Sequence, residues 1–347
     1  MFRVAILSFW HVHAGDYARE AEANPETEIV AVWDEAPDRG RAEAGKRGVD
    51  FHANLDDLLS RPDVDGVIVT TPTTAHHEVI PTAAKAGKHI FSEKVISPYL
   101  REAEEIVAVT EDAGVTFVVS LPRLYASYTR AIEETIEGGL LGEITYLRVR
   151  VSHDGALRTD QYSDGWLPTH FFDPGQSAGG VMIDFGAHPL YLVAHLLGMP
   201  EEVSAAYGHA TGREAEDNAV VTMRYRSGAL AVAEASFIGA ASPFAVEAHG
   251  TEGSLMFGIP DEKLYLRAAN AEDARWEARE PLPPDGPSPF EQWVMHASTG
   301  ATMSGNVRTA LQLNALAEAA NLSARTARSV RPHRNTEADR RSQAPAG

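Results

Sequence analysis

Residues 5–16 read AILSFWHVHAGD, an apolar strand pattern that runs into a turn and then into a helical pattern. In a dinucleotide-binding βαβ unit this turn carries the glycines of G-x-G-x-x-G, which let the backbone approach a pyrophosphate. Here Ser8 and Trp10 occupy the glycine positions, and His11 and His13 follow. The stretch therefore indicates either a dinucleotide turn rebuilt without its glycines or an H-x-H metal pair after a first strand.

The first 120 residues alternate short apolar runs with segments whose apolar residues recur at helical spacing. The second and fourth runs are nearly continuous in apolar residues, which is typical of parallel strands covered on both faces. The alternation predicts an α/β Rossmann domain with a doubly wound parallel sheet. The expected strands are residues 3–7, 28–34, 66–71, 89–94 and 116–121.

After about residue 122 the pattern changes to strands with one buried face, at 142–155, 218–237 and 243–258. Ser227-Gly228 divides the second of these and predicts a hairpin turn. A final helical region is expected over 289–328. We therefore predict an NAD-binding Rossmann domain at 1–122 and an α+β domain with a large, mostly antiparallel open sheet at 123–332. A disordered tail is expected at 333–347.

Composition excludes several classes of protein. The chain has 347 residues, a net charge of −19 and no cysteine. The negative charge argues against nucleic-acid backbones and anionic membranes as partners, and the missing cysteines exclude thiol catalysis, disulfides and zinc–thiolate sites. The sequence begins directly with a strand pattern and has no signal-peptide features, so we expect a cytoplasmic protein.

Asp34 ends the second expected strand, 26 residues after Ser8. An acid at this place in a βαβ unit accepts hydrogen bonds from the ribose hydroxyls of a dinucleotide. Glu35 follows it, and two carboxylates repel a 2′-phosphate, so NAD is favoured over NADP. The alternative interpretation is that Asp34 only terminates its strand.

Four further segments resemble the Gfo/Idh/MocA family of NAD(P)-dependent sugar and cyclitol oxidoreductases. They are DGVIVTTPTTAH (65–76), AGKHIFSEKV (86–95), GLLGEI (139–144) and GGVMIDFGAH (179–188), and the resemblance extends over essentially the whole chain. Three departures stand out from the family pattern. Ser8 and Trp10 replace glycines, Val95 replaces the proline of E-K-P, and Leu121-Pro122 replaces an asparagine–arginine pair that Arg123 then follows.

The resemblance implies that Lys94, Asp184 and His188 form the catalytic set and that the protein is a homodimer or homotetramer acting on a sugar or polyol. Candidate substrate-binding residues are Arg123, Tyr125, Tyr162, Trp166 and His170. The implied NAD pocket is lined by Ser8, Phe9, Trp10, His11, Val12, His13, Asp34, Thr71, Pro72, Thr73, His76, Glu93 and Lys94. No residue is assigned to a metal.

The chemistry of these residue types agrees with the implied reaction. Oxidising a secondary alcohol removes a hydroxyl proton, and a histidine is well suited as the general base. A lysine ammonium stabilises developing alkoxide charge, and a carboxylate orients the substrate or the base. Asp184 and His188 are four residues apart and share one face of a helical turn, which Gly186 and Pro189 place near a helix start.

Three other interpretations remain open at this point. HVH at 11–13 is also the metal pair of amidohydrolase barrels, although the antiparallel second half argues against that fold. A non-catalytic relative could bind a sugar or regulate a partner without using the altered turn. A tightly held nicotinamide could also cycle between its redox states in a lyase or epimerase.

Overall fold

The computed structural model describes residues 1–259, 261–269, 275–299 and 304–333. The chain forms two compact units: Met1–Leu121 with Pro287–Leu311, and Pro122–Gly286 with Gln312–Gly347. The expected tail falls almost entirely on 334–347, outside the described residues. Among the described residues, no helix has the length and apolar character needed to cross a bilayer.

Unit 1 contains a six-stranded sheet in the order β3-β2-β1-β4-β5-β6, with every pair parallel. Its strands are β1 (Phe2–Leu7), β2 (Thr27–Trp33), β3 (Asp50–His52), β4 (Gly66–Val69), β5 (His89–Ser92) and β6 (Phe117–Val119). The doubly wound sheet predicted from the sequence is confirmed. The sequence did not predict β3, because it has three residues and none of them is fully buried.

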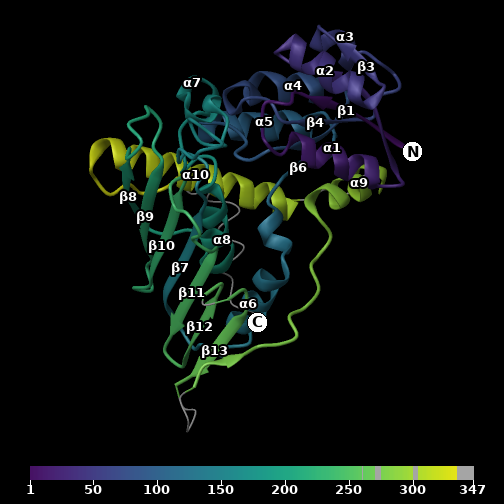
Figure 1. Cartoon of the computed structure of the whole chain (residues 1–347). Helices are drawn as coiled ribbons and strands as arrows, with labels where there is room; N and C mark the ends of the chain where they lie inside the picture. The colour runs from purple at the N-terminus through teal and green to yellow at the C-terminus, as the bar shows by residue number, and fades with distance from the viewer. Residues whose placement is uncertain (260, 270–274, 300–303, 334–347) are drawn as a thin grey trace. The chain divides into compact units, whose positions relative to one another are not determined.

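The helices of unit 1 are α1 (Ala14–Ala23), α2 (Pro37–Arg47), α3 (Leu55–Leu59), α4 (His76–Lys85), α5 (Leu100–Asp112) and α9 (Pro289–Thr299), with a 3-10 turn η1 (Thr73–Ala75). We expected α9 in the second domain, but it lies in unit 1 (Figure 1). Phe290 and Trp293 of α9 are fully buried and pack against Phe91 at ring distances of 5.6 and 5.8 Å. The unit-1 core therefore requires a helix that comes late in the chain.

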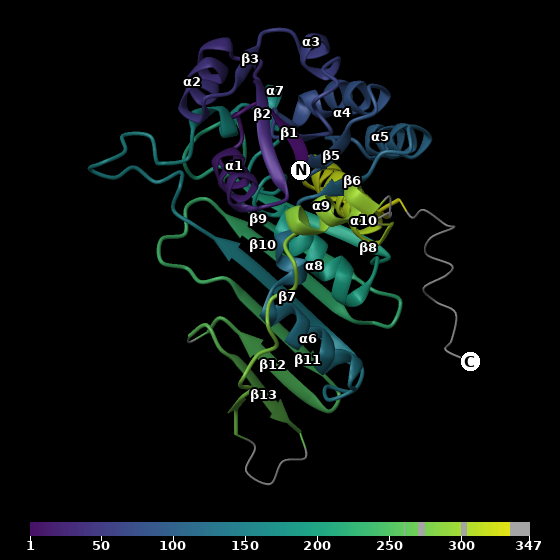
Figure 2. The same cartoon turned by 90° about the vertical axis from the view of Figure 1, so that its right-hand side faces the viewer.

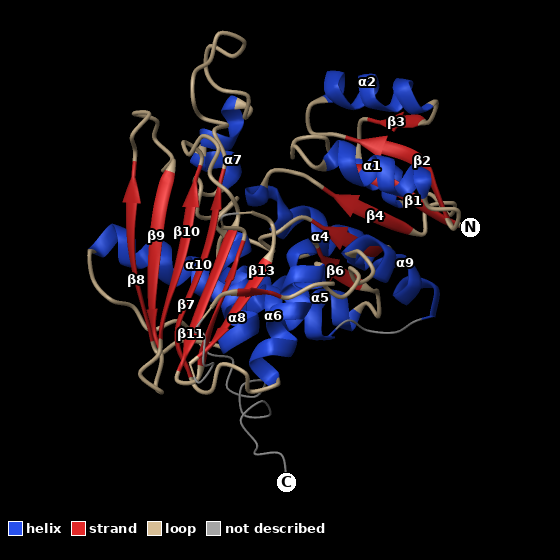
Figure 3. Ribbon diagram, turned by 60° about the horizontal axis from the view of Figure 1, so that its bottom comes forward, coloured by secondary structure: helices blue, strands red, loops and turns tan. Residues whose placement is uncertain are grey.

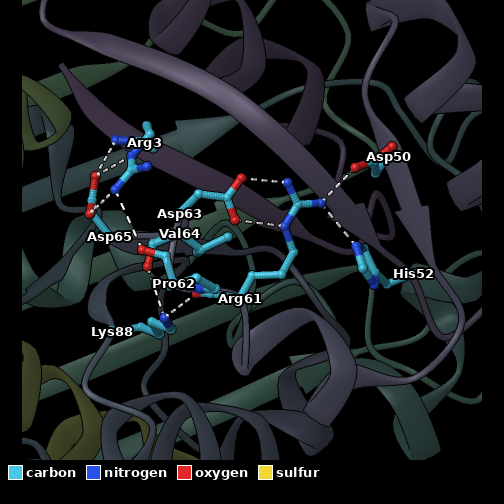
Figure 4. A network of polar contacts seen from close by, with 9 residues as sticks. All are labelled: Arg3, Asp50, His52, Arg61, Pro62, Asp63, Val64, Asp65 and Lys88. Atoms are coloured by element: carbon cyan, nitrogen blue, oxygen red, sulfur yellow. Dashed lines mark hydrogen bonds and ion pairs between the residues drawn. The ribbon is translucent and has the colours of Figure 1, made fainter.

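A network of charged residues lies at the N-terminal ends of β1, β4 and β5 (Figure 4). The cofactor is predicted at the opposite, C-terminal ends of these strands. The Arg3 backbone N–H and guanidinium both donate to Asp65, at 2.8 and 3.1 Å. The Arg61 guanidinium donates to Asp63 at 2.7 Å, and the Lys88 ammonium donates to two main-chain carbonyls at 2.8 Å. These bonds fix the entry into β4, so they belong to the scaffold.

Unit 2 contains an eight-stranded sheet in the order β14-β13-β12-β11-β7-β10-β9-β8. Figure 2 shows its strands from β13 to β8. Its strands are β7 (Ile144–Ser152), β8 (Glu202–Gly208), β9 (Asn218–Arg224), β10 (Leu230–Ser236), β11 (Ala245–Gly250), β12 (Gly253–Phe257), β13 (Leu264–Ala268) and β14 (Glu277–Ala278). Among the described strands of this sheet, only β7 and β10 pair in parallel. The mostly antiparallel sheet and its hairpin turn at Ser227-Gly228 are confirmed.

Helices α6 (Ser127–Glu137), α8 (Ala187–Leu197) and the later part of α10 (Ser304–Thr326) lie behind the sheet in Figure 3, where its other face points toward the viewer. Alternation along β7 explains this arrangement, because Leu147, Val149 and Val151 are buried whereas their neighbours are half-buried or exposed. The shorter elements are η2 (Pro122–Tyr125), η3 (Thr169–Phe172) and α7 (Pro174–Ser177). Helix α8 packs on β7 and β10, so the sheet supports this helix.

Candidate active site

The turn between β1 and α1 keeps a left-handed residue although it has no glycine there. Ser8 has φ +80°, a conformation that is uncommon for a residue with a Cβ. Its hydroxyl oxygen accepts the backbone N–H of Trp10 at 3.0 Å, and its carbonyl accepts the Thr70 hydroxyl at 2.6 Å. The Trp10 side chain is 4% exposed, so it packs inward. Helix α1 then begins at Ala14, with His13 at its N-cap.

Asp34 joins this turn to the start of α2. One carboxylate oxygen accepts the Phe9 N–H at 2.8 Å and the other accepts the Ala36 N–H at 2.7 Å. Arg39 donates to both oxygens, at 2.8 and 2.7 Å, so the carboxylate is held by four hydrogen bonds. Its side chain is fully buried. The sequence located Asp34, but it did not show that a guanidinium shares the carboxylate.

Glu93 and Lys94 follow β5 and are both buried. The Glu93 carboxylate accepts the Lys94 backbone N–H at 3.0 Å and the Tyr17 hydroxyl, and His11 Nδ1 lies 3.6 Å from it. Burial opposes the charge, but the positive charges of His11, Lys94 and His13 with the Tyr17 hydrogen bond hold the pKa of Glu93 below its usual value. A buried carboxylate thus stands directly beside the candidate lysine.

Two buried polar atoms near Glu93 have no hydrogen-bond partner among the described residues: Thr71 Oγ1 and His76 Nε2. His76 donates from Nδ1 to the carbonyls of Val95 and Ile96, at 3.1 and 3.2 Å, and the Lys94–Val95 peptide bond is cis. Burial lowers the pKa of His76. Since buried polar groups are normally paired, these two atoms fit a site that receives hydrogen-bonding groups from a ligand such as a dinucleotide.

The turn Gly179–Gly186 carries Asp184 into α8, and a buried glutamate anchors it. The Met182 N–H donates to Glu216 Oε1 at 3.0 Å, and the Val181 N–H donates to the Glu216 carbonyl at 2.9 Å. Burial raises the pKa of Glu216, although backbone hydrogen bonds to its carboxylate, the one from Met182 first among them, act against the rise. The sequence gave no signal for Glu216, because its partners lie more than 30 residues earlier in the chain.

His188 is the second residue of α8, as its neighbouring glycine and proline predicted. It is 7% exposed, and its Nδ1 lies 2.9 Å from the Tyr191 hydroxyl. The Arg123 backbone N–H donates to the same hydroxyl at 3.1 Å. Asp184 precedes the helix, and its N–H donates to the Gly180 carbonyl at 3.1 Å. One short segment of unit 2 therefore positions both Asp184 and His188.

The candidate substrate-binding residues of unit 2 differ in their surroundings. Tyr162 and Trp166 are both 41% exposed, and the Trp166 N–H donates to Asp154 at 2.9 Å. His170 lies against Phe171.

Two further candidates lie at the start of unit 2. The Arg123 guanidinium donates to the Tyr128 hydroxyl at 2.9 Å and lies over the Phe244 ring, and the Tyr125 carbonyl accepts the Gly286 N–H at 2.7 Å.

A further histidine, His153, lies near Asp184. It stacks on Phe237 with ring centroids 4.9 Å apart and also contacts Trp166 and Phe185. Burial lowers the pKa of His153, and the charge of Asp184 opposes this shift. Aromatic faces beside a carboxylate suit a ring-shaped polyol.

Within unit 1 the structure brings together the turn at 8–13 and the segments around Asp34, His76 and Lys94. Within unit 2 it brings together Asp184 and His188. Among the described residues there is no group of three or more histidines, aspartates or glutamates placed to hold a metal.

Both units match models of known protein families. Residues 9–121 match the model of the oxidoreductase family with an NAD-binding Rossmann fold, and residues 129–256 match the GFO/IDH/MocA C-terminal domain. The chain is 28% identical to 1,5-anhydro-D-fructose reductase of Ensifer adhaerens over 261 residues, 74% of this chain and 76% of that protein. It is 28% identical to myo-inositol 2-dehydrogenase of Thermotoga maritima over 217 residues, 60% of each chain.

Solved structures share the fold at lower identity. A putative NADPH-dependent oxidoreductase from Desulfitobacterium hafniense superposes with a TM-score of 0.81 at 21% identity, covering 95% of this chain and 97% of that one. Levoglucosan dehydrogenase in complex with NADH and levoglucosan gives 0.78 at 19% identity, covering 96% and 100%.

Proposed function

The chain belongs to the Gfo/Idh/MocA family of oxidoreductases, whose first domain is an NAD-binding Rossmann fold, and we propose that it transfers hydride between a sugar or cyclitol secondary alcohol and nicotinamide. The observation that carries the proposal is the buried Glu93–Lys94 pair with the unpartnered Thr71 and His76 atoms near it. Burying an ammonium next to a buried carboxylate costs free energy that a scaffold alone has no need to spend at this edge of the sheet.

For the cofactor, we propose that Asp34 binds the adenosine ribose and that the turn at 8–13, with the N-terminus of α1, faces the diphosphate. Phe9 and Val12 belong to that turn. Thr71, Pro72, Thr73, His76 and Glu93 would line the nicotinamide half. When bound, the nicotinamide supplies the acceptor or donor of hydride. NAD is the expected cofactor because Asp34 and Glu35 disfavour a second phosphate, although Arg39 offsets part of that charge.

For the reaction, we propose that His188 takes the hydroxyl proton at one ring nitrogen. The Lys94 ammonium stabilises the developing alkoxide as a point charge, and Asp184 holds the substrate hydroxyl or the protonated imidazole in place. The reverse direction uses the same groups with the proton returned to the alcohol. Tyr162, Trp166, His170, Arg123 and Tyr125 are proposed substrate contacts.

For assembly, we propose a homodimer or homotetramer formed through the sheet face that points away from α8. That face carries the Arg148 ion pairs with Glu234 and Glu247, at 2.8 and 3.0 Å, and the exposed side chains of Val220 and Leu230. Sedimentation of wild type and an Arg148→Glu variant tests this, and a wild-type monomer contradicts it.

The first experiment is calorimetric titration of the purified protein with NAD and NADP, after its absorbance spectrum has been checked for co-purified nicotinamide. A panel that begins with myo-inositol, levoglucosan and 1,5-anhydro-D-fructose then tests turnover. Binding with turnover that His188→Gln reduces by about 10²–10⁴-fold supports the proposal. A folded protein that binds neither dinucleotide would contradict it and favour a non-catalytic sugar-binding or regulatory relative.

A redox-cycling lyase or epimerase has a different signature. The nicotinamide would co-purify, and product would form without net change in the dinucleotide absorbance. This outcome would retain the proposed residues and replace only the net reaction.

A further inference from the structure

We propose that Tyr191 is a positioning residue that selects the tautomer of His188 with the ring proton on Nδ1, so that Nε2 is the nitrogen that receives the substrate proton. The inference rests on the proposed role of His188 as general base, and it adds a residue that the sequence did not single out.

The Tyr191 hydroxyl oxygen contacts both His188 Nδ1 and the Arg123 backbone N–H. Tyr191 is fully buried one helical turn after His188, and its hydroxyl lies 2.9 Å from Nδ1. The two rings meet edge to face at 73°, with centroids 5.5 Å apart. The Arg123 backbone N–H, from the neighbouring η2, donates to the same oxygen at 3.1 Å. The hydroxyl is therefore held from both the helix and the adjacent turn.

The number of protons at this oxygen limits what the contact can be. A tyrosine hydroxyl has one proton and two lone pairs, and Arg123 already donates to it. If Tyr191 donates to Nδ1, the neutral imidazole carries its own proton on Nε2 and has no basic nitrogen left. If Nδ1–H donates to the remaining lone pair, Nε2 is unprotonated and basic. Only the second arrangement allows His188 to act as a base.

The same arrangement survives the proton transfer. When Nε2 takes the proton, the Nδ1–H still donates to Tyr191, and the hydrogen bond becomes charge-assisted and stronger. In the opposite arrangement the Tyr191 hydroxyl would have to rotate its proton away from Nδ1 before it could accept a hydrogen bond from the imidazolium. A neutral hydroxyl also orients the ring without adding a carboxylate next to Asp184. Tyr191 thus acts through His188.

The tautomer is measured directly by long-range ¹H–¹⁵N correlation spectra of the ¹⁵N-labelled full chain, with His188→Gln assigning the resonance. This measurement uses neither cofactor nor substrate. We expect His188 to be protonated at Nδ1 in the wild type and to change toward Nε2 protonation in Tyr191→Phe. A wild-type His188 protonated at Nε2 overturns the inference.

Kinetics with the panel alcohol that is turned over give the second readout. Tyr191→Phe is expected to lower kcat by about 10–100-fold with KM and the NAD dissociation constant unchanged, the range expected for a hydrogen bond to a charged group. The control is Tyr225→Phe, which removes another buried hydroxyl of unit 2, bound to the Gly198 carbonyl at 3.1 Å. It should leave kcat unchanged, and equal kcat losses in the two variants would overturn the inference.

The His188→Gln variant distinguishes a failure of the role of Tyr191 from a failure of the role of His188 as base. An active Tyr191→Phe beside an inactive His188→Gln overturns only the role of Tyr191. A fully active His188→Gln overturns the base assignment and this inference together. Circular dichroism confirms that each variant is folded before its rate is compared.

Discussion

Replacing Asp34 by asparagine should loosen the turn before α1 and weaken dinucleotide binding. The buried carboxylate accepts hydrogen bonds from Phe9, Ala36 and both sides of the Arg39 fork. Asparagine keeps one acceptor oxygen, and its NH₂ group must face donors on the other side. Two of the four bonds are then lost.

The size of the effect follows from the surroundings of each lost bond. A hydrogen bond to a charged group contributes about 1.5–3 kcal/mol. Arg39 is 29% exposed, so water replaces part of what it loses. We therefore expect the free energy of unfolding to fall by about 2–4 kcal/mol, which overlaps only the lower part of the 3–5 kcal/mol range for breaking a fully buried pair.

The assay is urea unfolding followed by far-ultraviolet circular dichroism, with NAD affinity measured by calorimetry. Asp38→Asn is the matched control, because Asp38 lies in the first turn of α2, shortly after Asp34, and its side chain is fully exposed. It should change stability by less than about 0.5 kcal/mol. An Asp34→Asn variant as stable as this control would refute the reasoning about the turn. A destabilised variant that binds NAD as tightly as wild type would refute the ribose role.

Three further predictions concern unit 1. Arg39→Gln removes the cation that shares Asp34, so the ratio of NADP to NAD affinity should fall in paired titrations, and a constant ratio would contradict this. Trp293→Ala should lower the unfolding free energy by about 3–5 kcal/mol in urea, because the side chain is fully buried; a loss below about 1 kcal/mol would exclude it from the core. The hydrogen bond from Arg61 lowers the pKa of Asp63 from 3.8 to about 2, so this bond stabilises the fold above pH 4 and the stabilisation is lost as the pH falls toward 2. Urea titrations should therefore show the deficit of Arg61→Gln shrinking between pH 4 and 2, and a constant deficit would exclude Asp63 as its source.

The parts of the fold that were predictable are those whose signal is local. Strand β5 reads HIFS and is buried at its last three residues, so the nearly continuous apolar run of the fourth expected strand correctly indicated a parallel sheet covered on both faces. Strand β3 gave no such signal, since its three residues depend on pairing with β2. The apolar face of α9 indicated a helix, but an apolar face does not reveal which of two cores it will cover. Only the packing of Phe290 and Trp293 decides that.

The candidate site also combines residues that have a local sequence signal with residues that have none. His188 could be placed at a helix start because a glycine and a proline flank it. Tyr191 was within reach of sequence reasoning, since residues three apart on a helix are neighbours, but a tyrosine on an apolar helix reads as core. Glu216 was out of reach, because it accepts hydrogen bonds from Val181 and Met182, which lie more than 30 residues earlier in the chain and leave no local pattern.

The turn at 8–13 shows how a motif can change its residues and keep its shape. Glycine allows a positive φ at no steric cost, whereas Ser8 reaches +80° with a Cβ in place. The Ser8 hydroxyl offsets the steric cost of this conformation by accepting a hydrogen bond from the Trp10 N–H and another from Arg39 at 3.3 Å. A glycine has no side chain to accept either bond. Trp10 avoids the space in front of the turn by burying its ring. Hydrogen bonds to the Ser8 side chain therefore hold the turn in the conformation that glycine allows in the glycine-rich form. Because Arg39 donates to both Ser8 and Asp34, the same hydrogen bonds connect the turn to Asp34.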